Sequence, residues 1–250
     1  MRNSLSRILI LTKRNLKEII RDPLSLIFTI LMPLGMEILF YAIFHNMTSQ
    51  FDMKYLAPGI VVFSQSFLTL FTGLLIAVDR NNSFLTRLYV SRAKSHEFIF
   101  GYTFALVPVA FAQSVLFFVV GGIIDPSIFS LGMVLAILLS IVTAFFFIGL
   151  GILFGSVCTE KSIGGVASIV ITGQSLLSGM WFPVEGMSVG FLTAMRCLPF
   201  KNATELIQNV LIGAGDAFND IILPLIIVLA YALVTFAIAI PVFRKKMSSN

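Results

Sequence analysis

Long stretches of apolar residues alternate with short polar segments along the whole chain. A helix that crosses a lipid bilayer needs about 20 mostly apolar residues, at a rise of about 1.5 Å per residue. Stretches that meet this requirement lie at residues 24–44, 57–78, 98–123, 131–157, 163–182 and 221–243. The pattern therefore predicts an all-α integral membrane protein with six transmembrane helices.

The segment before the first apolar stretch, residues 1–23, has a different pattern. Leucine and isoleucine recur there at helical spacing, and basic residues fill the positions between them. This arrangement predicts an amphipathic helix that lies in the membrane interface and ends at Asp22-Pro23. Such a helix either docks at a specific site or serves only as a basic anchor that orients the first span.

Two of the connections between spans are long, at residues 79–97 and 183–220, and the others are short. No connection has room for a separate soluble domain of about 50 residues or more. We therefore expect residues 1–250 to form a single transmembrane domain.

The connection at 79–97 combines apolar residues at helical spacing with basic residues, which predicts a short amphipathic helix. If this helix docks onto a partner protein, its apolar residues fill a cleft and its arginines meet acidic groups at the rim. The alternative is a helix that lies on anionic lipid. The residues expected to dock are Phe84, Leu85, Arg87, Leu88 and Arg92.

The connection at 183–220 contains too many prolines and glycines to form a span, yet several of its residues are too apolar for a solvated loop. A partly re-entrant pair of short helices before the last span fits both facts, provided that protein or a water-filled cavity covers it. The alternative is a helix that rests on the outer leaflet. We place the re-entrant element over the outer mouth of a pathway, and the expected gate residues are Trp181, Phe182, Pro183, Phe191 and Leu198.

Composition and charge exclude a soluble enzyme. Hydrophobic residues make up 58% of the chain and charged residues only 12%, whereas soluble domains carry about 25% charged residues. Fourteen of the 17 lysines and arginines fall on one side of the predicted topology. By the positive-inside rule that side, with both termini, is cytoplasmic in a multi-pass plasma-membrane protein. The net charge of +5 thus reflects topology, and we expect no nucleic-acid partner.

The sequence also gives no sign of a catalytic or metal site. The nearest match to a phosphate-binding loop starts at Gly155, lacks the second glycine and joins two predicted spans, so we reject it. His45 and His96 fall on opposite sides of the membrane, as do Cys158 and Cys197, which excludes a paired site or an intrachain disulfide. We expect the chain to contain no catalytic residue, no metal and no cofactor of its own.

Strongly hydrogen-bonding side chains recur at one depth in the outer half of the predicted bundle. At about 1.5 Å per residue, they lie roughly 10–14 Å from the outer ends of four spans. This polar layer either lines a cargo pathway or joins helices within the subunit by hydrogen bonds. The residues are Glu37, Gln65, Gln113 and Gln174.

Two connections carry motifs of a known family. Leu85-Thr-Arg-Leu88, followed by Glu97-Phe98 and Gly101, resembles the segment between the second and third spans of ABC-2 type transporter permeases. Ser178-Gly179, Phe182-Pro183 and Cys197-Leu-Pro199 are similar to that family's outer loop before the last span. The resemblance extends over the whole chain.

This resemblance implies the membrane subunit of an ATP-binding cassette exporter. In such a complex two copies of a separate ATP-binding subunit bind ATP and Mg²⁺, and a second permease, identical or paralogous, completes the pathway among membrane lipids. The cargo, whether drug, lipid, peptide, glycan or ion, would cross by alternating access. The alternatives are a secondary transporter or channel that needs no ATPase, and a membrane scaffold. The sequence shows no convincing internal repeat of the kind often found in secondary transporters.

Overall fold

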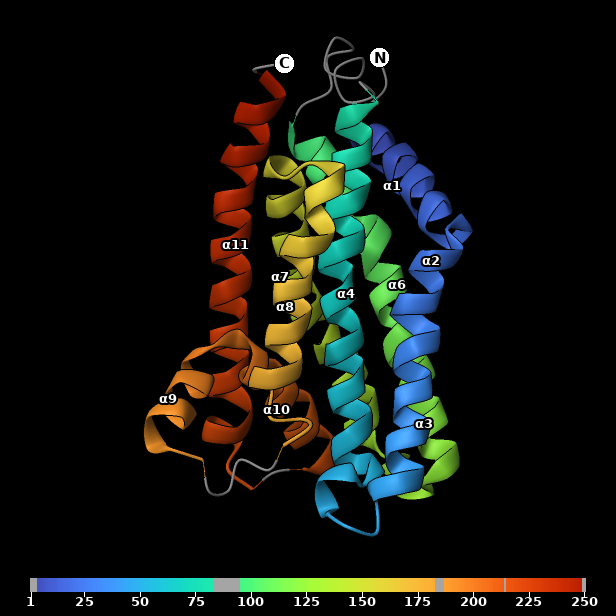
Figure 1. The fold of residues 1–250 in the computed structure, drawn as a ribbon, viewed down its shortest axis with the longest axis vertical. Coiled ribbons are helices and arrows are strands. Elements are labelled where there is room, and N and C mark those ends of the chain that lie inside the picture. The colour runs from blue at the N-terminus through green and yellow to red at the C-terminus, as the bar shows by residue number, and fades with distance from the viewer. Residues whose placement is uncertain (1–3, 83–94, 183–186, 214, 249–250) are drawn as a thin grey trace.

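The computed structural model describes residues 4–82, 95–182, 187–213 and 215–248, and helices connected by short turns make up nearly all of these ranges. Strands are absent from them. The helices form an elongated bundle, and the first and last helices reach the same end of it, which we name the terminal end (Figure 1). The described part of the chain is therefore all-α, as the sequence predicts.

Five helical segments in the described ranges are long and apolar enough to cross a membrane. Each covers one of the predicted stretches. The first combines the short helix α2 (Pro23–Leu26), a π-helical turn (Ile27–Leu31) and α3 (Met32–Phe44). The others are α4 (Met53–Asn81), α6 (Ser95–Ile124), α7 (Leu131–Val157), and a π-helical turn (Phe218–Ile222) that continues into α11 (Leu223–Ser248).

The sixth predicted span corresponds to α8 (Glu160–Leu177), which lies beside α4 (Figure 1). This helix is less apolar than the other five, because it begins with a charged pair and contains several serines, glycines and Gln174. It also ends before residue 182, and Gly179 follows with a φ of 75° that favours glycine. Five spans are thus supported by length and composition, and a sixth across α8 stays a prediction.

Helix α1 (Ser4–Arg21) runs obliquely along the side of the bundle at the terminal end (Figure 1). It buries one face, with Leu11, Asn15 and Ile19, against the bundle. Asp22 separates it from α2, and the Asp22 carboxylate accepts hydrogen bonds from the backbone N–H of Leu24 and the hydroxyl of Ser25. This cap before Pro23 turns the chain into the first span.

Helix α4 forms the centre of the bundle and is buried along most of its length. It approaches α7 closely because glycines face each other. A Cβ atom added at Gly155 would lie 2.7 Å from the carbonyl oxygen of Gly73, and one added at Gly151 would lie 2.5 Å from the Cβ of Thr72. The glycine pair in α7 therefore serves helix packing within one chain.

The end opposite the terminal end carries α9 (Val189–Cys197) and α10 (Pro199–Ile212). Helix α10 packs against α4, α7 and α11, and ends at Gly213, whose φ is 76°. Two short helices are therefore present where the sequence predicts a re-entrant pair. Their depth in a membrane stays a prediction.

Candidate functional site

Helix α1 is attached to both flanks of the predicted docking segment by ion pairs. Near the end of α4, the Asp79 carboxylate accepts two hydrogen bonds of 2.5 Å from the guanidinium of Arg14. In the first turn of α6, Glu97 accepts one of 2.9 Å from Arg7. One short helix thus holds the chain immediately before and after residues 83–94. We name these two ion pairs the α1 clamp.

The Asp79 side of the clamp is buried. Asp79 is 1% exposed, and the hydroxyl of Tyr102 donates a third hydrogen bond of 2.6 Å to its carboxylate. The Arg14 side chain stays 34% exposed. A buried carboxylate is stable only when its charge is paired and its lone pairs are satisfied, so this cluster fixes α1, α4 and α6 relative to one another.

The cluster also shifts the pKa values of two groups on α1. Burial opposes the charged guanidinium of Arg14, but the hydrogen bonds to Asp79 and the charges of Asp79 and Glu18 outweigh it, so the pKa of Arg14 is raised. Burial raises the pKa of Glu18, and the nearby Asp79 adds to this while Arg14 opposes it. Arg14 bridges both carboxylates, since it lies 2.9 Å from Glu18 as well.

The next residue of α4 reaches α7. Arg80 donates hydrogen bonds to the carbonyl oxygens of Gly155 (2.8 Å) and Ser156 (2.5 Å) at the end of that helix. Carbonyls in the last turn of a helix lack partners inside the helix, and a cation there is favourable. Asp79 and Arg80 together therefore link the end of α4 to α1, α6 and α7.

The predicted docking residues themselves, Phe84, Leu85, Arg87, Leu88 and Arg92, lie outside the described residues. Sequence analysis missed the α1 clamp, although a signal for it was present. Arg7 and Arg14 are seven residues apart, which places them on one face of a helix. Asp79 and Glu97 are the acidic residues that flank the predicted docking segment.

The four residues of the predicted polar layer are all completely buried within the chain. Gln65 is fully engaged, since its Nε2 donates to the carbonyl oxygen of Ser140 (2.9 Å) and its Oε1 accepts from the hydroxyl of Thr143 (2.5 Å). Gln174 donates to the hydroxyl of Thr204 (3.1 Å), which joins α8 to α10. Both glutamines therefore join helices within one subunit.

Gln113 compensates for a proline in the first span. Pro33 has no N–H, so the carbonyl oxygen of Thr29 lacks its usual helical donor. The side-chain Nε2 of Gln113 in α6 donates to that oxygen at 2.9 Å. The hydrogen bond satisfies a backbone group that water cannot reach and fixes the first span against α6.

Glu37 differs from the other three. Its side chain is completely buried, and among the described residues neither carboxylate oxygen has a hydrogen-bond partner. The carboxylate fits because its neighbour in α6 is a glycine. A Cβ atom added at Gly121 would lie 3.2 Å from Oε1 of Glu37. Interhelical hydrogen bonding therefore does not explain why Glu37 is buried in this layer.

Among the predicted outer-gate residues, Trp181 is the most closely packed. Its ring lies 4.5 Å from that of Phe40 between centroids, and its indole N–H donates to the hydroxyl of Ser175 (2.8 Å). Phe182 and Phe191 are exposed, Leu198 is half-buried, and Pro183 lies outside the described residues. A gating role for these residues stays a prediction.

Comparison with protein families matches residues 6–212 to the ABC-2 type transporter family. The match includes α1, the α1 clamp, the segment that this clamp flanks and α10. Comparison with curated proteins finds no match.

Proposed function

This chain belongs to the ABC-2 type transporter family, and we propose that it forms the membrane pathway of an exporter driven by a separate ATP-binding subunit. Family membership supports a permease subunit that associates with such an ATPase. We infer that ATP and Mg²⁺ bind to two copies of this partner and that the permease performs no catalysis itself. The cargo would be a drug, lipid, peptide, glycan or ion.

The observation that carries the mechanism is the α1 clamp. When the ATPase moves residues 83–94, a flexible attachment would let this segment move alone. The buried ion pairs of Asp79 and Glu97 instead make α1, the end of α4 and the start of α6 move as one body. Packed helices respond to such a displacement by shifting as rigid elements. We infer that this shift changes the access of the pathway.

A second permease subunit is supported by the outward face of α8. This helix buries its most tightly packed apolar residues inside the chain, while Ser168 and Thr172 are exposed together with Ile169 and Leu176. Small and hydroxyl-bearing residues such as this serine and threonine are enriched where transmembrane helices pack against each other. We propose that the polar face of α8 lies against a second permease or the aqueous pathway, and that both termini are in the cytoplasm of a plasma-membrane protein.

Copurification with the ATPase tests the proposal. An ATP-binding subunit should copurify with the permease from its native membrane, and Leu85→Asp should release this subunit and abolish transport because the carboxylate cannot enter an apolar cleft. Leu85→Met keeps an apolar side chain and serves as the matched control. Normal copurification and coupling in Leu85→Asp would contradict the docking assignment. Transport by the permease alone would favour a secondary transporter or channel.

A further inference from the structure

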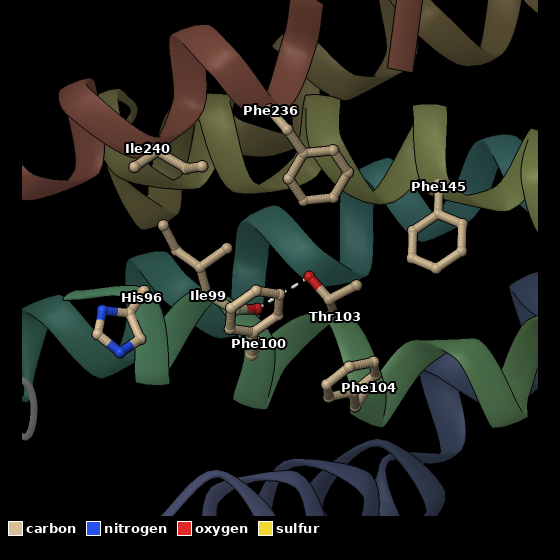
Figure 2. Close-up of a pocket in the computed structure, with 8 residues that line it drawn as sticks. All are labelled: His96, Ile99, Phe100, Thr103, Phe104, Phe145, Phe236 and Ile240. Atoms are coloured by element: carbon tan, nitrogen blue, oxygen red, sulfur yellow. Dashed lines mark hydrogen bonds between the residues drawn. The ribbon is translucent and has the colours of Figure 1, made fainter. Parts of the chain in front are cut away.

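A slot of about 350 Å³ opens between α6 and α11, with α7 as its floor, near the terminal end of the bundle. Aromatic and aliphatic side chains line it from both sides, as Figure 2 shows. The volume lies at the lower end of the range for small-molecule sites, roughly 300–1,000 Å³. The residues that line it are His96, Ile99, Phe100, Thr103, Phe104, Phe145, Phe236 and Ile240.

The slot exists because α11 packs along α7 rather than along α6. A Cβ atom added at Gly149 in α7 would lie 2.8 Å from Oγ1 of Thr235 and 3.2 Å from the ring of Phe236, so the glycine draws α11 close to α7. Between α6 and α11, the rings of Phe98 and Phe243 lie 6.4 Å apart. Phe98, Thr235 and Phe243 are buried in the bundle, so its packing holds the walls of the slot in place.

The walls of the slot are suited to a hydrocarbon chain. The rings of Phe100 and Phe104 stack at 5.7 Å along α6, and the rings of Phe145 in the floor and Phe236 in the opposite wall lie 6.4 Å apart. Among the lining residues that the structure describes, Thr103 carries the one hydroxyl, and this donates to the carbonyl oxygen of Ile99 in its own helix (2.8 Å). The interior therefore offers dispersion contacts and little hydrogen bonding.

The mouth of the slot has a different chemistry. His96 lies one turn before Phe100 on α6, and Arg244 lies one turn after Ile240 on α11. Residues four apart share a helix face, so both polar residues lie at the same, terminal end of the slot. His96 lines the slot and is exposed, and Arg244 is exposed one turn beyond the lining. This places hydrogen-bond donors and a positive charge above an apolar channel.

We propose that this slot binds an anionic phospholipid of the cytoplasmic leaflet, with one acyl chain between α6 and α11 and the phosphate at Arg244 and His96. Arginine beside a membrane attracts anionic headgroups, and basic pockets between transmembrane helices are known to hold them. The separation of an apolar channel from a cationic mouth favours this occupant over a wholly apolar molecule. The site adds a lipid ligand to the proposed function and needs no particular cargo.

Photo-crosslinking in nanodiscs tests the proposal. The permease is reconstituted with a trace of phosphatidylglycerol that carries a diazirine near the end of one acyl chain, or with phosphatidylcholine that carries the same group. Mass spectrometry then locates the labelled peptides. We expect the anionic probe to label the α6 and α11 peptides that contain Phe100, Phe104 and Phe236, several-fold more than the zwitterionic probe does.

Two variants separate the channel from the mouth. Ile240→Trp fills the slot from an exposed position and should reduce labelling by both probes, whereas Ala112→Trp adds the same ring to α6 outside the slot and should not. Arg244→Gln should reduce labelling by the anionic probe about fivefold, the factor expected from removing one basic group near the surface. Lys13→Gln removes a charge from the same end and serves as its control.

Equal labelling by the two probes, or unchanged labelling in Ile240→Trp, would overturn the proposal. The assay contains no ATPase and measures no transport, so such a result would leave the proposed permease function untouched. Conversely, loss of ATPase copurification would not affect the lipid result.

Discussion

The α1 clamp leads to a prediction about the pair Arg14 and Asp79. We consider Arg14→Gln, Asp79→Asn and the double variant. The Arg14→Gln protein retains a buried carboxylate that accepts only from Tyr102 among the three donors described above. The Asp79→Asn protein retains an arginine that can still turn toward Glu18 and water. The double variant leaves neither charge at the site.

The expected losses follow from burial. Removal of one partner from a buried ion pair costs about 3–5 kcal/mol. Because the Arg14 side chain is 34% exposed while that of Asp79 is 2% exposed, water reduces this cost. We expect a loss of about 3 kcal/mol for Arg14→Gln and about 2 kcal/mol for Asp79→Asn. The double variant should lose less than the sum, with a coupling energy of about 1–3 kcal/mol.

Equilibrium unfolding of the purified permease in one detergent measures these losses. The rate of ATP hydrolysis, compared with the rate of transport, reports their effect on coupling. We expect both single variants to hydrolyse ATP with reduced transport, because α1 no longer moves with α4. Arg21→Gln, which removes an exposed arginine from the last turn of the same helix, is the matched control and should change stability by less than about 0.5 kcal/mol.

Additivity would refute this reasoning. If the two single losses sum to that of the double variant within about 0.5 kcal/mol, Arg14 and Asp79 do not form an energetic pair. If the losses are coupled but transport stays normal in all three variants, the clamp stabilises the fold and plays no part in transmission.

The other predictions concern single side chains. Gln113→Leu should destabilise the permease by about 0.6–1.7 kcal/mol, since the Thr29 carbonyl loses its donor, and unfolding in detergent measures this; an unchanged stability would contradict it. Glu37→Gln should assemble normally and lose export if its charge acts in the pathway, and normal export across a pH range would exclude that role. Because the pKa of Glu18 is raised in the folded state, the stability that its protonated form contributes is lost as pH rises from the ordinary glutamate value of 4.5 through the raised one. The Glu18→Gln protein should lack this loss when its free energy of unfolding is measured against pH. Curves that run parallel for the two proteins would contradict the prediction.

Much of the fold follows from the sequence because the bilayer imposes strong local rules. Backbone groups in lipid must be satisfied within the helix, so an apolar stretch of about 20 residues predicts a helix wherever it occurs. The helices at Met53–Asn81 and Leu131–Val157 cover their predicted stretches for this reason. The helix before the first span was predictable from its amphipathic spacing, and the break after it from Asp22-Pro23.

The contacts between helices were not predictable, because they depend on which faces meet. The sequence predicts that Gln65 and Gln113 lie in one layer, yet the tertiary structure gives them different partners. Gln65 bonds to a hydroxyl and a carbonyl of a neighbouring helix. Gln113 donates to a carbonyl that Pro33 leaves without a donor. Hydropathy places a polar residue at a depth but says nothing about its rotation toward a neighbour.

The sequence by itself determined that the chain is an all-helical membrane protein with an amphipathic helix before its first span, since length, periodicity and hydropathy are local properties. Only the tertiary structure decided that Arg7 and Arg14 hold the two flanks of the predicted docking segment, and that α6 and α11 separate into an apolar slot. Both features join residues more than 60 positions apart. Ion pairs and cavities form between such residues only through packing, which no local pattern specifies.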